Sequence, residues 1–582
     1  MAFNRYYEDE LAYLRDLGDL FAHENPTLAG FLSREASDPD VERLLEGFAF
    51  LTARLRQKLD DELPEAVHGL MEIVWPHYLR PLPPLTIVAF DQVGGGGPVP
   101  IRVPRGTQVR SRPVDGTSCA FATSYHVDVL PLAVAAAEID NRSTSSRLVV
   151  EIRTTPRGSL RALQGGRLRL HFSTERDPLV GRVLYLWMLR YTTTITATTD
   201  TGETVELGPA ACRPVGFAED EAVLPAPATA FPAFRLLQEY LAFPAKFLFV
   251  DVEGLEPLVA SAGTRLTLAF EFRRPLPAQA RLSGAQIRLN ATPAVNLFEA
   301  EAQPIAVSAA KTEYRVVAAG APAVAIHAVE AAVGHVQGRG ERVPIHPFHS
   351  FRHDGAAGGD GRLYFKVRVR PAVVGNGIDH YVAFVDGSDR IATPQVEVVS
   401  LTLSASNGRL AQRIAVGHID QAGWNTPSTV SFSNIASVLG EVPPPIEDAL
   451  LWRLISNLAR NFRTIVGREP LRALIASHDF RALHDAQARR RLELLLSGIE
   501  DFTDQPGDAI VRGAPVRLRR LVLTVAESRL GGEAEMFLFG TVLDAFLAAY
   551  AGINSLQRLT IRGSEENASY DYPMRRGLGT AV

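Results

Sequence analysis

The stretch FRLLQEYLAFPAKFLFVDV, residues 234–252, contains the transition that decides the fold. The apolar residues that recur in it at helical spacing are Leu236, Leu237, Tyr240 and Leu241. Pro244 cannot continue that helix, and residues 247–252 run apolar over the length of a buried strand. We predict a helix, a corner and a strand in the core of a β-rich domain. A direct subunit contact is the alternative.

The same strand pattern continues on both sides of this stretch, from residue 85 to about residue 425. Segments that alternate or run apolar over strand lengths are TIVAFDQV (86–93), RLRLHFST (167–174), RLTLAFEF (265–272), RLYFKVRVR (362–370) and VEVVSLTLS (396–404). Gly, Pro, Asp and Asn separate them, as expected for turns. We predict two β-rich domains here, at 81–280 and 281–425.

Helices are predicted at both ends of the chain. The first 80 residues contain a helix near 4–23, a second at 38–65 and a third that ends at the proline-rich WPHYLRPLPP (75–84). Helical spacing returns in LLWRLISNLARNF (450–462), LRALIASHDF (471–480), ALHDAQARRRLELLLSGI (482–499) and GTVLDAFLAAYAGI (540–553), with strands at 515–526 and 556–563. The predicted fold class is therefore α+β multidomain. It has an N-terminal helical bundle segment (1–80), β-rich central domains and an α+β C-terminal domain (426–582).

The second helix, DPDVERLLEGFAFLTARLRQKLDDELPE (38–65), is more apolar than a surface helix requires. Its apolar stripe comprises Val41, Leu44, Leu45, Phe48, Leu51, Leu55 and Leu59. Phe50 lies nearly opposite Phe48, so a second face is apolar too. The sequence leaves two interpretations open, a core helix or a helix shared with another chain. We expect Leu51 to lie in a core, and Phe50 to be covered only in an assembly.

Composition narrows the class of protein. The 582 residues are 46% apolar and 21% charged, with a net charge of −5, which is typical of globular proteins. No basic tract indicates nucleic-acid binding. Cys119 and Cys212 match no metal or redox spacing. The N-terminus lacks the pattern of a secretory signal, and no apolar run is long enough to span a membrane. We expect a soluble, cytoplasmic chain without direct membrane insertion.

Motifs of catalysis are missing from the sequence. There is no phosphate-binding loop and no nucleophile elbow, and the run Gly94–Gly97 predicts a hairpin loop rather than a dinucleotide site. HPFHSFRH contains His346, His349 and His353. Pro347 and the aromatic residues indicate a loop or an extended strand, and we interpret the three as loop histidines, with a metal site as the alternative. We therefore expect no enzyme, no metal and no cofactor. A hydrolase whose groups meet only in space stays open.

Nine segments together resemble the TssF family (also called VasA or ImpG), a baseplate subunit of the bacterial type VI secretion system. They occur in family order at 4–18, 38–65, 75–84, 103–116, 234–252, 292–305, 312–317, 450–462 and 537–559. Tyr572 stands where the family often has tryptophan, and Ala405 where it has cysteine. The resemblance therefore implies no role for these two positions.

The resemblance implies a structural role in a baseplate wedge. Two TssF copies join one TssG, TssG carries TssK, and TssK docks on the inner-membrane complex. Six wedges surround a spike hub and support the contractile sheath and tube. The resemblance places the partner interface on the N-terminal helices, at Tyr7, Leu11, Leu14, Leu44, Phe48, Phe50, Leu51 and Leu55. The alternatives are a carbohydrate- or peptide-binding β protein and, last, the hydrolase.

Overall fold

The computed structural model divides the chain into two units. We call Met1–Val74 with Glu447–Trp452 the N-terminal unit, and Trp75–Ile446 with Arg453–Val582 the body. The described residues are 7–8, 11–12, 14–15, 40–41, 43–54, 68, 71–72, 75–225, 232–280, 282, 286–308, 310–320, 324–335, 342–348, 363–372, 377–386, 396, 398–446, 466–511, 514–551 and 556–577. The segment 450–462, predicted as a helix, lies outside them.

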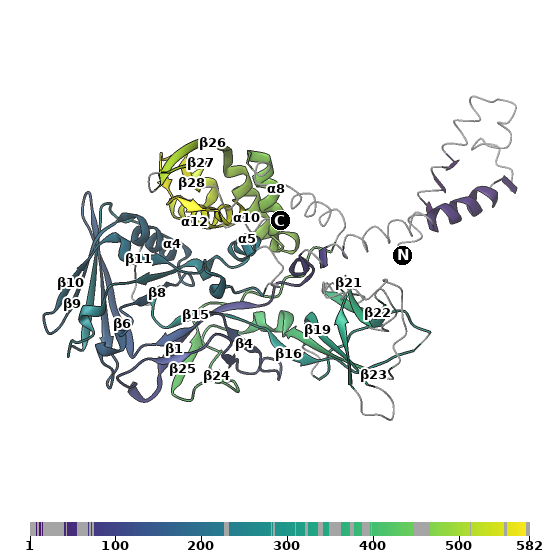
Figure 1. Ribbon diagram of the computed structural model, residues 1–582, viewed down its shortest axis with the longest axis horizontal. Helices are drawn as coiled ribbons and strands as arrows, with labels where there is room; N and C mark the ends of the chain where they lie inside the picture. Colours follow the sequence, from purple (N-terminus) through teal and green to yellow (C-terminus); the bar gives the residue numbers. More distant parts are fainter. Residues whose placement is uncertain are drawn as a thin grey trace. The chain divides into compact units, whose positions relative to one another are not determined.

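The described residues of the N-terminal unit before residue 73 are all helical, including 40–41 and 43–54 (purple in Figure 1). This agrees with the helical segment predicted for residues 1–80. The proline-rich segment that follows forms a single 3₁₀ turn, η2 (Pro76–Leu79), because Pro76 can only open a helical turn and the later prolines cannot continue it.

One sheet of the body is six-stranded and antiparallel, in the order β24-β3-β4-β15-β1-β25. Its strands are β1 (Leu85–Gln92), β3 (Gln108–Arg110), β4 (Ala120–Thr123), β15 (Ala291–Val295), β24 (Gln421–Ala422) and β25 (Val430–Asn434). These strands come from three of the four predicted stretches, so the sheet crosses the boundaries predicted near 280 and 425. The sheet crosses these boundaries because its hydrogen bonds join strands that are distant in sequence. The four-domain division remains a proposal.

The Gly94–Gly97 run begins in the 3₁₀ turn η3 (Val93–Gly95) and continues as a loop, and it does not form the predicted hairpin. It follows β1, and the next strand, β2 (Ile101–Val103), pairs with β5 (Val127–Val129) in a separate two-stranded sheet. Gly94 and Gly96 have φ angles of 69° and 76°, which side chains disfavour. The loop can therefore redirect the chain from one sheet to another.

Two further sheets and two helical elements build the largest core. The five-stranded sheet has the order β10-β9-β13-β7-β6, and the four-stranded sheet has the order β11-β12-β8-β14. Their bounds are β6 (Leu132–Asn141), β7 (Ser146–Thr154), β8 (Leu168–Phe172), β9 (Thr192–Thr199), β10 (Thr204–Leu207), β11 (Cys212–Pro214), β12 (Phe249–Val252), β13 (Arg265–Phe272) and β14 (Ile287–Arg288). Between β8 and β9 run α4 (Pro178–Leu186) and the π-helical turn η5 (Trp187–Tyr191).

The stretch 234–252 has the predicted helix, corner and strand. They are α5 (Pro232–Ala242), η8 (Pro244–Phe247) and β12, which begins two residues later than expected. β12 is buried along its whole length, between β11 and β8. Since residues 233–243 are buried as well, the core interpretation is confirmed and the subunit contact at this place is not.

Residues 298–406 form a sheet that curls back on itself, in the order β16-β23-β19-β20-β21-β22-β18, with β17 also paired to β23. Its strands are β16 (Phe298–Glu301), β17 (Ile305–Ala306), β18 (Tyr314–Arg315), β19 (Ala325–His335), β20 (Arg342–Pro347), β21 (Tyr364–Pro371), β22 (Ile378–Val385) and β23 (Val398–Ser406). A bridge between Ala302 and Ala318 joins its two edges. The sheet is therefore barrel-like.

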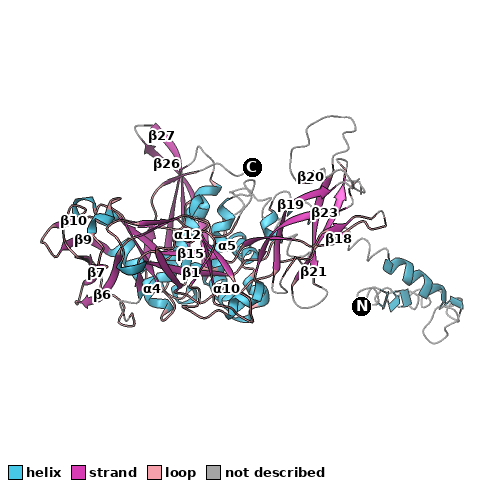
Figure 2. Cartoon of the chain, turned by 90° about the horizontal axis from the view of Figure 1, so that it is seen from below, coloured by secondary structure: helices cyan, strands magenta, loops and turns pink. Residues whose placement is uncertain are grey.

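The C-terminal part combines helices with a sheet of order β26-β27-β28-β29. The elements are α8 (Arg468–His478), α9 (Arg481–His484), α10 (Ala486–Gly498), β26 (Ile499–Val511), β27 (Ala514–Val525), α11 (Glu527–Leu530), α12 (Glu533–Tyr550), β28 (Leu556–Gly563), β29 (Ser569–Asp571) and β30 (Arg575–Arg576). Figure 2 shows β26 and β27 projecting as a hairpin. β27 and β28 are paired in parallel, and α12 is part of the chain segment that connects them. This agrees with the predicted α+β character.

The core of this C-terminal part is continuous with that of the four- and five-stranded sheets. Nearly all of α12 is buried, as expected of a helix that is apolar on every side. Tyr572 packs against this helix, and its hydroxyl donates a hydrogen bond to the carbonyl oxygen of Phe537 at 2.8 Å. Ala405 is fully buried in β23. Both departures from the family pattern are therefore packing positions.

Candidate interaction surface

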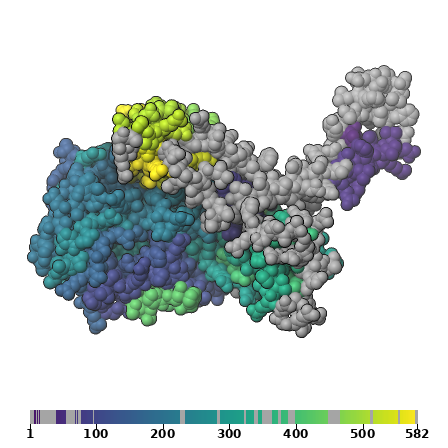
Figure 3. Space-filling model, in the orientation of Figure 1, coloured from purple at the N-terminus to yellow at the C-terminus, as the bar shows by residue number. Residues whose placement is uncertain are grey.

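The helix at residues 43–54 (purple in Figure 3) exposes four of its five large apolar side chains. Successive residues of a helix are about 100° apart, so Leu44, Phe48 and Leu51 lie within about 60° of one another. Their exposed fractions are 74%, 57% and 60%. Thr52, beside them, donates its hydroxyl hydrogen to the carbonyl oxygen of Phe48 at 2.7 Å. We call Leu44, Phe48 and Leu51 the outward stripe.

The opposite side of the same helix carries two buried alanines, and Leu45, about 40° from Ala49, is half-buried. Ala49 and Ala53 are both 0% exposed and lie about 150° from the outward stripe. An amphipathic helix usually buries its large apolar residues, and this helix does the reverse. The expectation that Leu51 lies in a core is therefore wrong for the single chain, because the alanine face is the buried one.

The other predicted interface residues divide into three groups. Phe50 is 44% exposed and lies between the two faces. Tyr7, Leu11 and Leu14 are half-buried in helical segments. Leu55 lies outside the described residues. The structure thus brings three of the eight predicted residues together on one exposed face, and their role as an interface remains a prediction.

Charged residues inside the stretch 234–252 form a buried network that was not among the predicted sites. Lys246 and Glu239 are both 0% exposed and form an ion pair across the corner after α5. The other oxygen of Glu239 accepts hydrogen bonds from the backbone N–H groups of Val223 and Leu224, at 2.8 and 2.9 Å. Burial lowers the pKa of Lys246, and Glu239 opposes that shift. The signal was visible as charged residues within a core-like segment.

A second network, of hydrogen bonds and ion pairs, links the start of α12 to α4, α5 and α10. Glu535 is 3% exposed and accepts a hydrogen bond from the Tyr240 hydroxyl at 2.7 Å. Arg182 and Arg491 lie 2.6 and 3.1 Å from its carboxylate oxygens. A carboxylate in the first turn of a helix also suits the helix dipole. Because the Glu535 carboxylate is buried and paired with both arginines, it stabilises the packing of α12 rather than presenting a reactive side chain.

The histidine-rich segment gives no metal site in the part of the chain that the structure describes. His346 is exposed at the end of β20, while His349 and His353 lie outside the described residues. No group of three or more potential ligands meets among the described residues. Of the two predicted conformations, a loop or an extended strand, His346 has the strand, because it pairs with Tyr364 in a parallel ladder between β20 and β21.

An outward apolar stripe, together with charged networks enclosed in the core, indicates the class of structural assembly subunits. Residues 1–578 match the model of the family "Type VI secretion system, TssF". The chain therefore belongs to the TssF family, and the resemblance seen in the sequence is confirmed. It is 29% identical to the "Type VI secretion system component TssF1" of Pseudomonas aeruginosa strain PAO1, over 96% of each chain.

Two solved structures contain chains of similar fold. One is a cryo-electron microscopy structure of the TssK-TssF-TssG baseplate subcomplex, with a TM-score of 0.74 and 28% identity over 92% of this chain and 99% of that one. The other is the baseplate complex from the type VI secretion system, with a TM-score of 0.61 and 26% identity over 99% of both chains. Within the described residues, no helix is long and apolar enough to cross a membrane.

Proposed function

We propose that this chain is a structural wedge subunit of the type VI secretion baseplate and assembles with TssG and TssK. The outward stripe is the observation that carries the proposal. Burying a large apolar side chain is worth about 1.5–3 kcal/mol, and a folded chain gains nothing from holding three of them in water. A partner that covers the stripe recovers that free energy.

The finer arrangement follows the family. Two copies of this chain bind one TssG, and the stripe of each copy packs in a helical bundle with the other copy and TssG. The wedges then surround the hub, meet the sheath and tube, and dock through TssK at the cytoplasmic side of the inner-membrane complex. A continuous apolar stripe supports such a bundle, because helices associate through apolar faces. This role requires no catalysis and no cofactor.

Co-expression tests the proposal. The chain produced alone should self-associate or be poorly soluble, because its stripe is exposed. Co-expression with TssG should give a discrete complex, and light scattering should measure a mass of two copies of this chain per TssG. A well-behaved monomer whose mass does not change with TssG would contradict the wedge role. That outcome would favour the peptide- or carbohydrate-binding alternative.

A further inference from the structure

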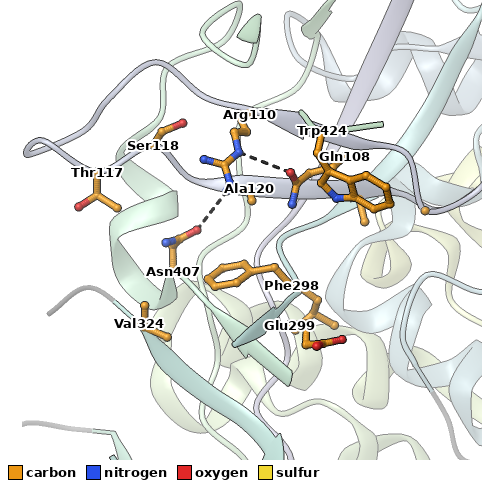
Figure 4. A pocket seen from close by; sticks show the side chains of 13 residues that line it. Gln108, Arg110, Thr117, Ser118, Ala120, Phe298, Glu299, Val324, Asn407 and Trp424 are labelled. Carbon is orange, nitrogen blue, oxygen red and sulfur yellow. Dashed lines mark hydrogen bonds between the residues drawn. The ribbon is translucent and has the colours of Figure 1, made fainter. Parts of the chain in front are cut away.

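A cavity of about 560 Å³ opens on the body, where β3 and β4 meet β16 (Figure 4). Its floor is formed by the cross-strand pairs Gln108–Ala122 and Arg110–Ala120. Alternate residues of a strand face opposite sides, so these side chains lie opposite the core residue Val109. Two alanines in the floor leave room that larger side chains would fill.

Two aromatic residues flank this floor. Trp424, in the loop after β24, is 84% exposed. Phe298, at the start of the edge strand β16, is half-buried. Figure 4 shows Trp424 beside Gln108 and the ring of Phe298 on the same side of the cavity as Glu299. Tryptophan contributes more to binding hot spots than most residue types, so its exposure beside a cavity points to a ligand.

Hydrogen bonds hold the Trp424 loop in place although the tryptophan itself is exposed. Asn425 accepts a hydrogen bond from the backbone N–H of Gln108 at 2.7 Å, and Thr426 donates to the Gln108 carbonyl oxygen. Gly423 passes so close that a Cβ there would lie 2.4 Å from that oxygen. The loop is therefore ordered before any ligand binds, which lowers the entropic cost of binding.

The backbone along the cavity is already paired. Gln108 uses its N–H and carbonyl groups on the Trp424 loop. Ala120 donates its N–H to Asn407, and its carbonyl oxygen accepts a hydrogen bond from Asn296 at 2.6 Å. A ligand consequently cannot add to β3 or β4 as a further strand here. Recognition has to come from a side chain that enters the cavity.

Two charges of opposite sign complete the rim. Arg110 and Glu299 are exposed, and neither forms an ion pair with another described residue. The Arg110 guanidinium donates a long hydrogen bond, 3.5 Å, to Gln108 Oε1 and keeps its charge for a ligand. Opposite charges beside the aromatic residues Trp424 and Phe298 suit a ligand that carries both signs around an apolar group. A polypeptide segment provides this combination directly, whereas a neutral sugar has no charge to match.

We propose that this cavity binds an extended segment of a partner protein. The segment inserts one aromatic or large aliphatic side chain between Trp424 and Phe298. It places an acidic residue near Arg110 and a basic residue near Glu299. This docking site is separate from the outward stripe and does not depend on the wedge role.

Selection from a phage library of random dodecapeptides tests the proposal, with the full chain immobilised and counter-selection on Trp424→Ala. The enriched peptides should share an apolar anchor between an acidic and a basic residue. Trp424→Ala should weaken their binding at least about tenfold, as for a hot-spot residue, and Trp424→Phe should retain most of it. Arg110→Glu should shift the preference towards a basic residue on that side.

Ile510→Ala provides the matched control, because Ile510 is also apolar and 82% exposed but belongs to the β26–β27 hairpin. It should leave peptide binding unchanged. The proposal fails if no peptide is enriched over the Trp424→Ala counter-selection, or if the enriched peptides lack the anchor. It also fails if a glycan array shows binding that depends on Trp424, because the cavity would then be a carbohydrate site.

Discussion

Leu51→Asp and Ala53→Asp should have opposite effects on folding and on partner binding. Leu51 is 60% exposed, so an aspartate there stays solvated and the N-terminal unit should remain folded. Ala53 is 0% exposed, and an unpaired carboxylate at that position costs several kcal/mol. We therefore expect Ala53→Asp to unfold the helix, and Leu51→Asp to leave it intact but to weaken the complex with TssG.

The magnitude follows from the exposed fractions. At 74%, 57% and 60%, the outward stripe exposes roughly the area of two fully exposed large side chains, worth about 3–6 kcal/mol when covered. The share of Leu51 is about 1–2 kcal/mol, which corresponds to a loss of about 5- to 30-fold in affinity. Desolvation of the new carboxylate adds to that loss.

Hydrogen exchange of the amides at 43–54 in the full chain measures folding, and titration with TssG measures affinity. Arg54→Asp is the matched control, because Arg54 is exposed but lies off the stripe. It should alter neither quantity strongly. If Leu51→Asp keeps its protection and binds TssG as tightly as the wild type, the stripe is not an interface. If Leu51→Asp loses protection, Leu51 is a core residue and the outward orientation is wrong.

Three further predictions concern the body. Lowering the pH from 6.5 to about 4 should lower the thermal midpoint of the body. Burial lowers the pKa of five histidines, because the fold favours their neutral form. Their contribution to the free energy of unfolding is complete above the unfolded pKa of about 6.5 and is lost as the pH falls towards the folded pKa values. A flat profile would contradict this. The folded pKa values are about 3 for His77, His171 and His327 and about 4 for His380 and His478. Lys246→Met should reduce the free energy of unfolding in denaturant by about 3–5 kcal/mol, because Glu239 would stay buried without its main cation. Lys311→Met, at an exposed position, should change it by less than about 0.5 kcal/mol, and equal effects of the two variants would refute the role of the pair. Gly540→Ala should cost about 1–3 kcal/mol in the same assay, because its Cβ would lie 2.4 Å from the hydroxyl oxygen of Tyr572, and Tyr572→Phe should recover part of that loss. No recovery in the double variant would argue against this clash.

Local chemistry was enough to predict the elements in which one pattern dominates. In 234–252 the helical spacing, the proline and the apolar run all indicate the observed helix, corner and strand. β1 and β13 were equally clear, because strand periodicity persists over their whole length. The family segments depend on local sequence too, so the sequence alone led to the TssF family.

Helix starts are harder to predict where charges are buried. α12 begins at Glu533, seven residues before the predicted start at residue 540. The sequence pattern gives the later start because Glu533 and Glu535 interrupt the apolar run, as solvent-exposed residues would. Their partners Arg274 and Arg491 come from distant segments, and only folding brings them within ion-pair distance.

Tertiary structure alone decided which surfaces are available for binding. Periodicity identifies the apolar stripe of the helix at 43–54, but not that Ala49 and Ala53 would be the buried side. Likewise, Gln108, Phe298 and Trp424 lie more than a hundred residues apart in sequence and share one cavity. β15 and β25 pair with β1 across about 200 and 340 residues. These pairings join the predicted stretches 81–280, 281–425 and 426–582 in one sheet. The physical reason is that burial and strand pairing depend on contacts between distant segments, whereas periodicity reports only what neighbouring residues favour.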